Sequence, residues 1–139
     1  MTVRSERGTA ALELALIAPV LVLLVAIVVA AGRMVETKAA VLSVAREAAR
    51  AASEAPNAAA AHDAALATAE EVAAGLGLDP GRLSIAQDPG GFGRGEPYRV
   101  SVSYRVQLAD LPGLGLLPGS VELGAEHAEL IQTYKSRWP

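Results

Sequence analysis

Glu13 is the one ionisable residue in a long apolar stretch that runs from Thr9 to Gly32. An ionised carboxylate costs about 2.5 kcal/mol or more at the centre of a membrane helix and less near its ends, so such residues usually have a partner or a function. If the peptide bond between Gly8 and Thr9 is cleaved, the new amine at Thr9 can neutralise a Glu13 carboxylate. We expect that carboxylate to belong to a neighbouring subunit, because charge pairing is strong where the dielectric constant is low.

The apolar stretch has the length of a membrane-spanning helix. It carries no charge between Leu14 and Gly32. At about 1.5 Å of rise per residue, a helix from Thr9 to Gly32 covers roughly 36 Å, and a bilayer core is about 30 Å thick. A buried core helix is the alternative, but the rest of the chain is too small and too rich in alanine to surround a helix that is apolar on all faces. Residues 9–32 are therefore predicted to be a transmembrane helix.

The flanking charges predict how this helix is oriented. Arg4 and Arg7 precede it, and Arg33 follows it. By the tendency of positive charge to stay in the cytoplasm, residues 1–8 form a cytoplasmic leader and residues 33–139 form an exported domain. The expected location is the cytoplasmic (inner) membrane, with a single pass and an extracytoplasmic C-terminal domain.

Two other interpretations of the N-terminus remain open. In the first, a secretory signal peptide is cleaved after Val29-Ala30-Ala31, although the length of the apolar stretch and the acid at Glu13 argue against it. In the second, the helix is a plain uncleaved anchor. Pro19 lacks an amide proton and leaves the Ala15 carbonyl without its helical partner, so a helix kink is predicted there, either as a bend used in packing or as an incidental feature.

Composition narrows the function. The formal charge is −3 and Lys and Arg are not clustered, so we expect no nucleic-acid partner. The chain has no cysteine, which rules out disulfides and Cys-ligated metals. His62 and Asp63 have no further metal ligands nearby in sequence, and His127 lies among acids with no nucleophile. We therefore expect no metal site, no cofactor and no catalytic residues, and the chain is not predicted to be an enzyme.

Two helices are expected. The first runs without interruption from Thr9 to Ser53, and an apolar stripe on it should receive the rest of the exported domain. That stripe comprises Val35, Leu42, Ala45, Ala49 and Ala52. The second helix begins after Asn57 as N-cap, covers residues 58–76, and has as its apolar side Leu66, Ala69, Val72, Ala73 and Leu76.

Three strands complete the expected fold. Leu83 and Ile85 alternate with polar residues, and residues 98–108 alternate strictly. The glycine-rich segment 88–97 is interpreted as a hairpin connection, because it lacks the context of a phosphate-binding loop. The last strand starts at Val121, with a bulge expected near His127.

The loop before this last strand contains four leucines. It either folds back onto the domain or forms a contact patch near the membrane or another subunit. The chain is expected to end in a frayed tail at residues 135–139, with Trp138 docked. The fold class is thus α+β: a long N-terminal transmembrane helix continues into an exported domain with one further helix and a small, mainly antiparallel three-stranded sheet.

Arg7-Gly8 followed by TAALELALIAPVLVLL, and then GRMVETKAAVLSVAREAARAAS, resembles the TadE-like pseudopilins of tight-adherence (Flp) pilus systems, which are relatives of type IV pilins. The resemblance implies a pilin-like fold. It also implies that a prepilin peptidase cuts between Gly8 and Thr9, and that Glu13, the fifth residue of the mature chain, guides subunit alignment.

The resemblance further implies a function. The chain would be a non-catalytic minor pseudopilin that assists assembly or initiation of a Flp (type IVb-like) pilus. Its partners would be other pilins or pseudopilins, the prepilin peptidase, the assembly platform proteins and ATPase, and the membrane. The competing hypothesis is a single-pass membrane-anchored binding domain unrelated to any filament.

Overall fold

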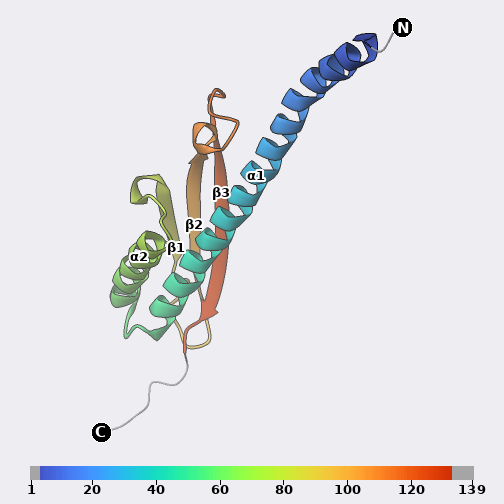
Figure 1. Cartoon of the computed structure of the whole chain (residues 1–139). Coiled ribbons are helices and arrows are strands. Elements are labelled where there is room, and N and C mark those ends of the chain that lie inside the picture. The colour runs from blue at the N-terminus through green and yellow to red at the C-terminus, as the bar shows by residue number, and fades with distance from the viewer. Residues whose placement is uncertain (1–3, 133–139) are drawn as a thin grey trace. The chain divides into compact units, whose positions relative to one another are not determined.

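The computed structural model describes the backbone of residues 4–132 and the side chains of residues 8–132. Its first element, α1, is an unbroken helix from Arg4 to Glu54 (Figure 1). This confirms the long helix expected from Thr9 to Ser53. The predicted tail at residues 135–139, with Trp138, lies outside the described residues.

The chain divides into two compact units. One contains α1 up to Met34 together with Gln107–Gly119, and the other contains Val35–Val106 and the chain from Ser120 onward. The loop between the last two strands therefore belongs with the apolar part of α1. The remaining helices and strands form the second unit, which we call the α+β unit.

The sheet of the α+β unit has three antiparallel strands in the order β1-β2-β3. They are β1 (Leu83–Asp88), β2 (Pro97–Gln107) and β3 (Ser120–Leu130). The β1–β2 register places Leu83 opposite Tyr104 and Asp88 opposite Arg99. This arrangement confirms the predicted α+β class with one small antiparallel sheet.

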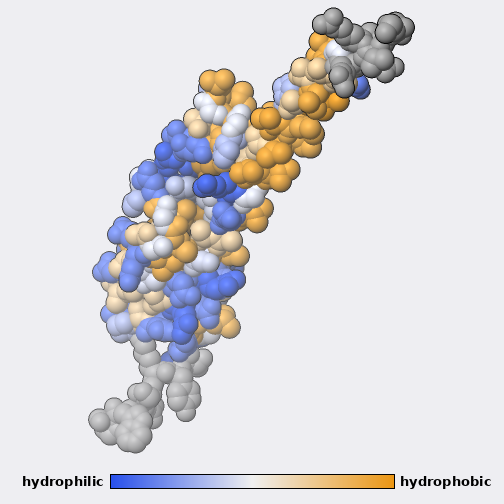
Figure 2. All heavy atoms as spheres, viewed as in Figure 1, coloured by the Kyte–Doolittle hydropathy of each residue, from blue (hydrophilic) through white to orange (hydrophobic). Residues whose placement is uncertain are grey.

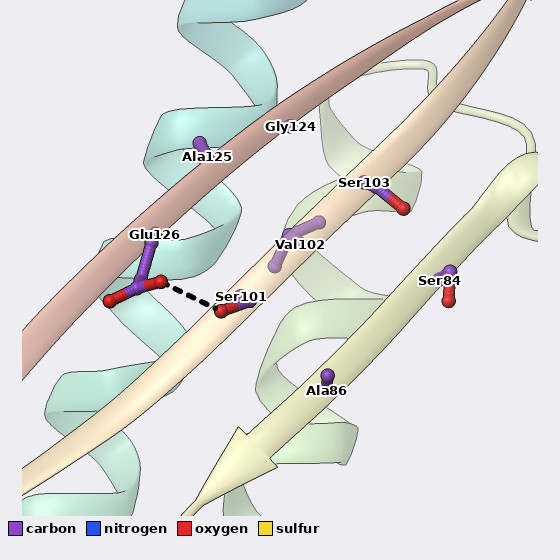
Figure 3. A pocket seen from close by; sticks show the side chains of 8 residues that line it. All are labelled: Ser84, Ala86, Ser101, Val102, Ser103, Gly124, Ala125 and Glu126. Atoms are coloured by element: carbon purple, nitrogen blue, oxygen red, sulfur yellow. Dashed lines mark hydrogen bonds between the residues drawn. The ribbon is translucent and has the colours of Figure 1, made fainter.

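Residues 35–54 of α1 and the second helix, α2 (Ala58–Gly75), lie on the same side of the sheet (Figures 1 and 3). The side chain of Lys38 on α1 donates a hydrogen bond to the backbone oxygen of Gly124 on β3. Alternate residues of β2 are buried, as its strict alternation predicts. They are Tyr98, Val100, Val102, Tyr104 and Val106.

Alanine dominates the buried faces of both helices. The buried residues of α1 in this unit are Val41, Val44, Ala45, Ala48, Ala49 and Ala52, and those of α2 are Ala61, Ala65, Ala69 and Ala73. The predicted α1 stripe is right for its three alanines and wrong for Val35 and Leu42, which are 69% and 37% exposed. Because alanine carries only a methyl group, each helix can approach its neighbours closely at these positions.

The start of α2 is as predicted. Asn57 is the N-cap, and its side-chain oxygen accepts a hydrogen bond of 2.9 Å from the backbone amide of Ala60. On the predicted apolar side, Ala69 and Ala73 are buried, whereas Leu76 is 47% exposed. Leu76 is outside the helix, because α2 ends at Gly75 and Leu76 forms its C-cap.

The bulge predicted near His127 is wrong. The alternation of half-buried and exposed residues continues unchanged from Ser120 to Leu130. Leu130 is consequently 61% exposed, and His127 is half-buried with its Nε2 3.3 Å from a carboxylate oxygen of Glu129. Pairing between strands fixes a period of two, and a single exposed leucine is tolerated more easily than a break in that pairing.

Candidate functional site

The residues singled out from the sequence all lie on α1. Gly8, Thr9, Glu13 and Pro19 are exposed positions in one continuous helix. Thr9 and Glu13 are four residues apart, so they lie on the same face, one turn apart. A charge at the N-terminus of a chain beginning at Thr9 would therefore be close to the Glu13 carboxylate. Their roles in processing and alignment remain predictions.

The helix does not end at its internal proline. Pro19 lies inside α1, which Figure 1 shows as one continuous helix. Helices in membranes accept proline because neighbouring groups and local adjustment satisfy the freed carbonyl. A local bend at this position stays a prediction.

The described residues around Glu13 are apolar and exposed. Leu12, Leu14 and Leu16 are each about two-thirds exposed. The helix is long and apolar enough to cross a membrane, and only 6% of its most apolar window is buried. Figure 2 shows mostly hydrophobic surface along the apolar part of α1. Such low burial distinguishes it from the core helix of a soluble domain, so α1 is a candidate membrane span consistent with membrane anchoring.

The outer face of the sheet carries a hollow that the sequence analysis missed. Its volume is about 370 Å³ and it opens widely to solvent. The side chains around it are small, apart from one acid (Figure 3): Ser84, Ala86, Ser101, Val102, Ser103, Gly124, Ala125 and Glu126. The signal was available, because small residues occupy the outward positions of neighbouring strands.

The residues that line this hollow do not form a set of catalytic groups. Its ionisable lining residue is Glu126, whose carboxylate accepts a hydrogen bond of 3.3 Å from the hydroxyl of Ser101. General acid–base catalysis needs titratable groups held within hydrogen-bond distance of a reacting atom. A single solvent-facing acid on an open surface does not provide that arrangement.

The glycine-rich segment between β1 and β2 behaves as the predicted hairpin connection. The carboxylate of Glu96 accepts a hydrogen bond of 3.1 Å from the amide of Gly93. A Cβ atom added at Gly91 would lie 2.6 Å from an oxygen of that same carboxylate. The negative charge of Glu96 therefore occupies the space that a phosphate would need, which argues physically against an anion-binding loop.

Comparison with known proteins gives one family. Residues 8–50 match the family model described as TadE-like protein, and this match confirms the resemblance over those residues. The matched segment begins at Gly8, and it includes Thr9, Glu13 and Pro19. Neither the curated proteins nor the solved structures provide a match to the chain.

Proposed function

We propose that this protein is a minor pseudopilin that assists assembly or initiation of a Flp-type pilus. The proposal starts from the match of residues 8–50 to the TadE-like family model. The family match relates the chain to Tad pilus systems. The finer assignment depends on a single observation: the match begins at Gly8 and contains Glu13 at the fifth position after it, in an apolar helix whose surface around Glu13 is exposed.

The proposed action starts in the inner membrane, with residues 1–8 in the cytoplasm and the α+β unit outside. A prepilin peptidase cuts the bond between Gly8 and Thr9. Cleavage leaves an ammonium group at Thr9, and the Glu13 carboxylate of one subunit attracts the ammonium group of the next. In hydrocarbon this attraction is strong and directional, so it sets the axial position of neighbouring helices.

In this proposal the chain itself is non-catalytic. Peptide cleavage, ATP hydrolysis and extraction from the membrane are carried out by the prepilin peptidase, the assembly ATPase and the platform proteins. The contribution of this chain is lateral packing of α1 against other pilins or pseudopilins. The exposed leucines and valines around Glu13 supply the surface for that packing.

The first test is the intact mass of the protein purified from membranes of its native host. A mature chain that begins at Thr9 supports the proposal. A chain that begins at Gly32 indicates a secreted domain, and an unprocessed chain favours a plain anchored binding domain without a filament. Either of these two results would contradict the pseudopilin assignment.

The second test separates alignment from processing. Glu13→Leu should leave membrane insertion intact and reduce cross-linking to pilins or pseudopilins, because the partner ammonium group loses its counter-charge. Glu36→Leu is the matched control, since Glu36 is an exposed acid on the same helix beyond the apolar stretch. Equal cross-linking by the two variants would remove the role proposed for Glu13.

A further inference from the structure

The loop between β2 and β3 packs directly on the apolar part of α1. Gly113 has a φ of +76°, and a Cβ atom added there would lie 2.4 Å from the Cβ of Ala26. Ala30, one turn further along α1, is only 5% exposed, and Leu111 of the loop is 6% exposed. A side chain at position 113 would not fit, so glycine permits the close approach of the loop to the helix.

This contact lies within the apolar stretch, away from its polar end. Ala26 precedes Gly32 by six residues, which at about 1.5 Å of rise per residue is roughly 9 Å along the helix. If residues 9–32 span a bilayer, a segment touching Ala26 reaches below the level of the polar headgroups. The loop would then lie in the same apolar environment as the transmembrane helix.

The side chains of the loop are suited to an apolar environment. The segment from Leu111 to Val121 has no charged residue. Leu116 is 99% exposed and Leu117 is 51% exposed, and Figure 2 shows hydrophobic surface along this part of the molecule. Two neighbouring exposed leucines are unfavourable in water, and they are stabilised when their apolar area leaves water.

Several backbone amides of the loop are hydrogen-bonded within the loop region, as an apolar environment requires. The amide of Leu111 bonds to the oxygen of Leu108 and that of Leu114 to the oxygen of Leu111, each at 3.1 Å, and the amide of Leu117 bonds to the oxygen of Leu114 at 2.9 Å. Pro112 and Pro118 have no amide proton to satisfy. Consecutive turns thus pair much of the loop internally, which lowers the cost of placing it where water is scarce.

We propose that residues 111–118 form a second membrane-contacting element, a leucine-rich loop that enters the interfacial region of the lipid bilayer beside α1. The occupant of this surface is lipid, because the loop lies against a helix that is itself a candidate span and continues its apolar surface. Lipid contact at this loop holds the β2–β3 connection at the membrane. The inference requires an inserted span and does not require a pilus.

The test uses the fact that the chain has no cysteine, so a single one can be introduced and labelled. Leu116→Cys carries an environment-sensitive fluorophore (NBD) in the full chain, reconstituted in phosphatidylcholine–phosphatidylglycerol nanodiscs. Leu76→Cys is the matched control, an exposed leucine of the α+β unit. Leu117→Cys provides a second loop position in case the first label disturbs folding, which circular dichroism would show.

The label at position 116 should emit at shorter wavelength than the label at position 76. It should also lose most of its quenching by aqueous iodide and be quenched by lipids that carry a nitroxide high on the acyl chain. Quenching by iodide equal to that at position 76 would overturn the proposal. Shielding from both iodide and lipid nitroxide would also overturn it, because the loop would then be covered by protein.

Gly113→Ala sharpens the test at the contact itself. The new Cβ would collide with Ala26 in a backbone conformation that favours glycine, so the loop should move off the helix and the nitroxide quenching at position 116 should fall. Unchanged quenching in this variant would contradict the contact with α1. Failure of the pilus proposal would appear in the intact mass and would leave these quenching results untouched.

Discussion

The two halves of α1 belong to one continuous helix and are made for different surroundings. Before Met34, large aliphatic side chains such as Leu16 and Val22 are exposed around the helix. After Val35, the buried positions are mainly alanines, and Ala45, Ala48 and Ala49 have no exposed surface. The first half therefore presents apolar area that is mostly exposed, whereas the buried face of the second half consists mainly of methyl groups that the sheet and α2 cover.

The difference shows that hydrophobicity and burial within the chain are separate properties of this helix. A sheet and a second helix cover residues 35–54, and the methyl groups of alanine let these elements approach closely. Among the residues that the structure describes, nothing comparable covers most of the first half, so its stabilisation must come from lipid or from neighbouring helices. Substitutions at buried and at exposed positions test this difference between the two halves.

The largest effect is expected from removing a buried aromatic ring. Tyr98 is 1% exposed, and its hydroxyl donates a hydrogen bond to the side-chain oxygen of Gln87. Tyr98→Ala should lower the free energy of unfolding of the α+β unit by about 3–5 kcal/mol, as for other large buried aromatic residues. Urea titration of the nanodisc-embedded chain, followed by circular dichroism, measures this change.

Leu24→Ala is the control for that measurement. Leu24 is a large apolar residue of the first half and is 57% exposed. Its truncation should leave the urea midpoint of the α+β unit unchanged, because it contributes no packing there. A similar loss of stability in both variants would show that the two halves are not energetically distinct.

The next effect is expected from enlarging a buried alanine. Ala49 has no exposed surface, whereas Ala39 on the same helix is exposed. Ala49→Leu should cost about 1–3 kcal/mol of stability through overpacking, and Ala39→Leu should be close to neutral. The same urea titration compares them. Equal stability of both variants would mean that close approach of α1 to the sheet is unimportant.

These alanines also explain how far the fold could be predicted. Strict alternation identified β2 and its buried face, because each large residue there has a polar neighbour. On α1 the helical spacing also places Val35 and Leu42 on the predicted stripe, and both are exposed. In a helix this rich in alanine, the buried face is marked by the smallest residues, and periodicity alone does not separate it from the exposed alanines.

The candidate site shows the same limit. Glu13 stands out in the sequence because a charge in an apolar run is rare, and its position needs no tertiary information. The contact of Gly113 with Ala26 joins residues far apart in the chain, and the two alternatives left open for this loop could not be separated by its composition. The loop folds back, yet onto α1, and it keeps Leu116 exposed.

A smaller effect is expected at the start of α2. The side chain of Asn57 accepts a hydrogen bond from the amide of Ala60. The first amides of a helix have no partner within the helix, so such a cap stabilises the helix start. Asn57→Ala should lower the stability of the α+β unit by about 1 kcal/mol. Asn57→Asp keeps the acceptor and should restore most of it. Hydrogen exchange of the first turn of α2 measures both, and identical exchange in the two variants would contradict the capping role.

The smallest effect is expected on the solvated face of α1. Nε of Arg50 lies 3.3 Å from a carboxylate oxygen of Glu54, and both side chains are more than half exposed. An exposed pair at this spacing contributes about 0.3–0.5 kcal/mol, and salt screens it. Arg50→Ala should therefore lower stability only slightly at low salt and not at all at high salt. A large loss of pilus assembly in this variant, with its stability intact, would instead identify this face as a subunit contact, and the second half of α1 would then share the packing role proposed for the first.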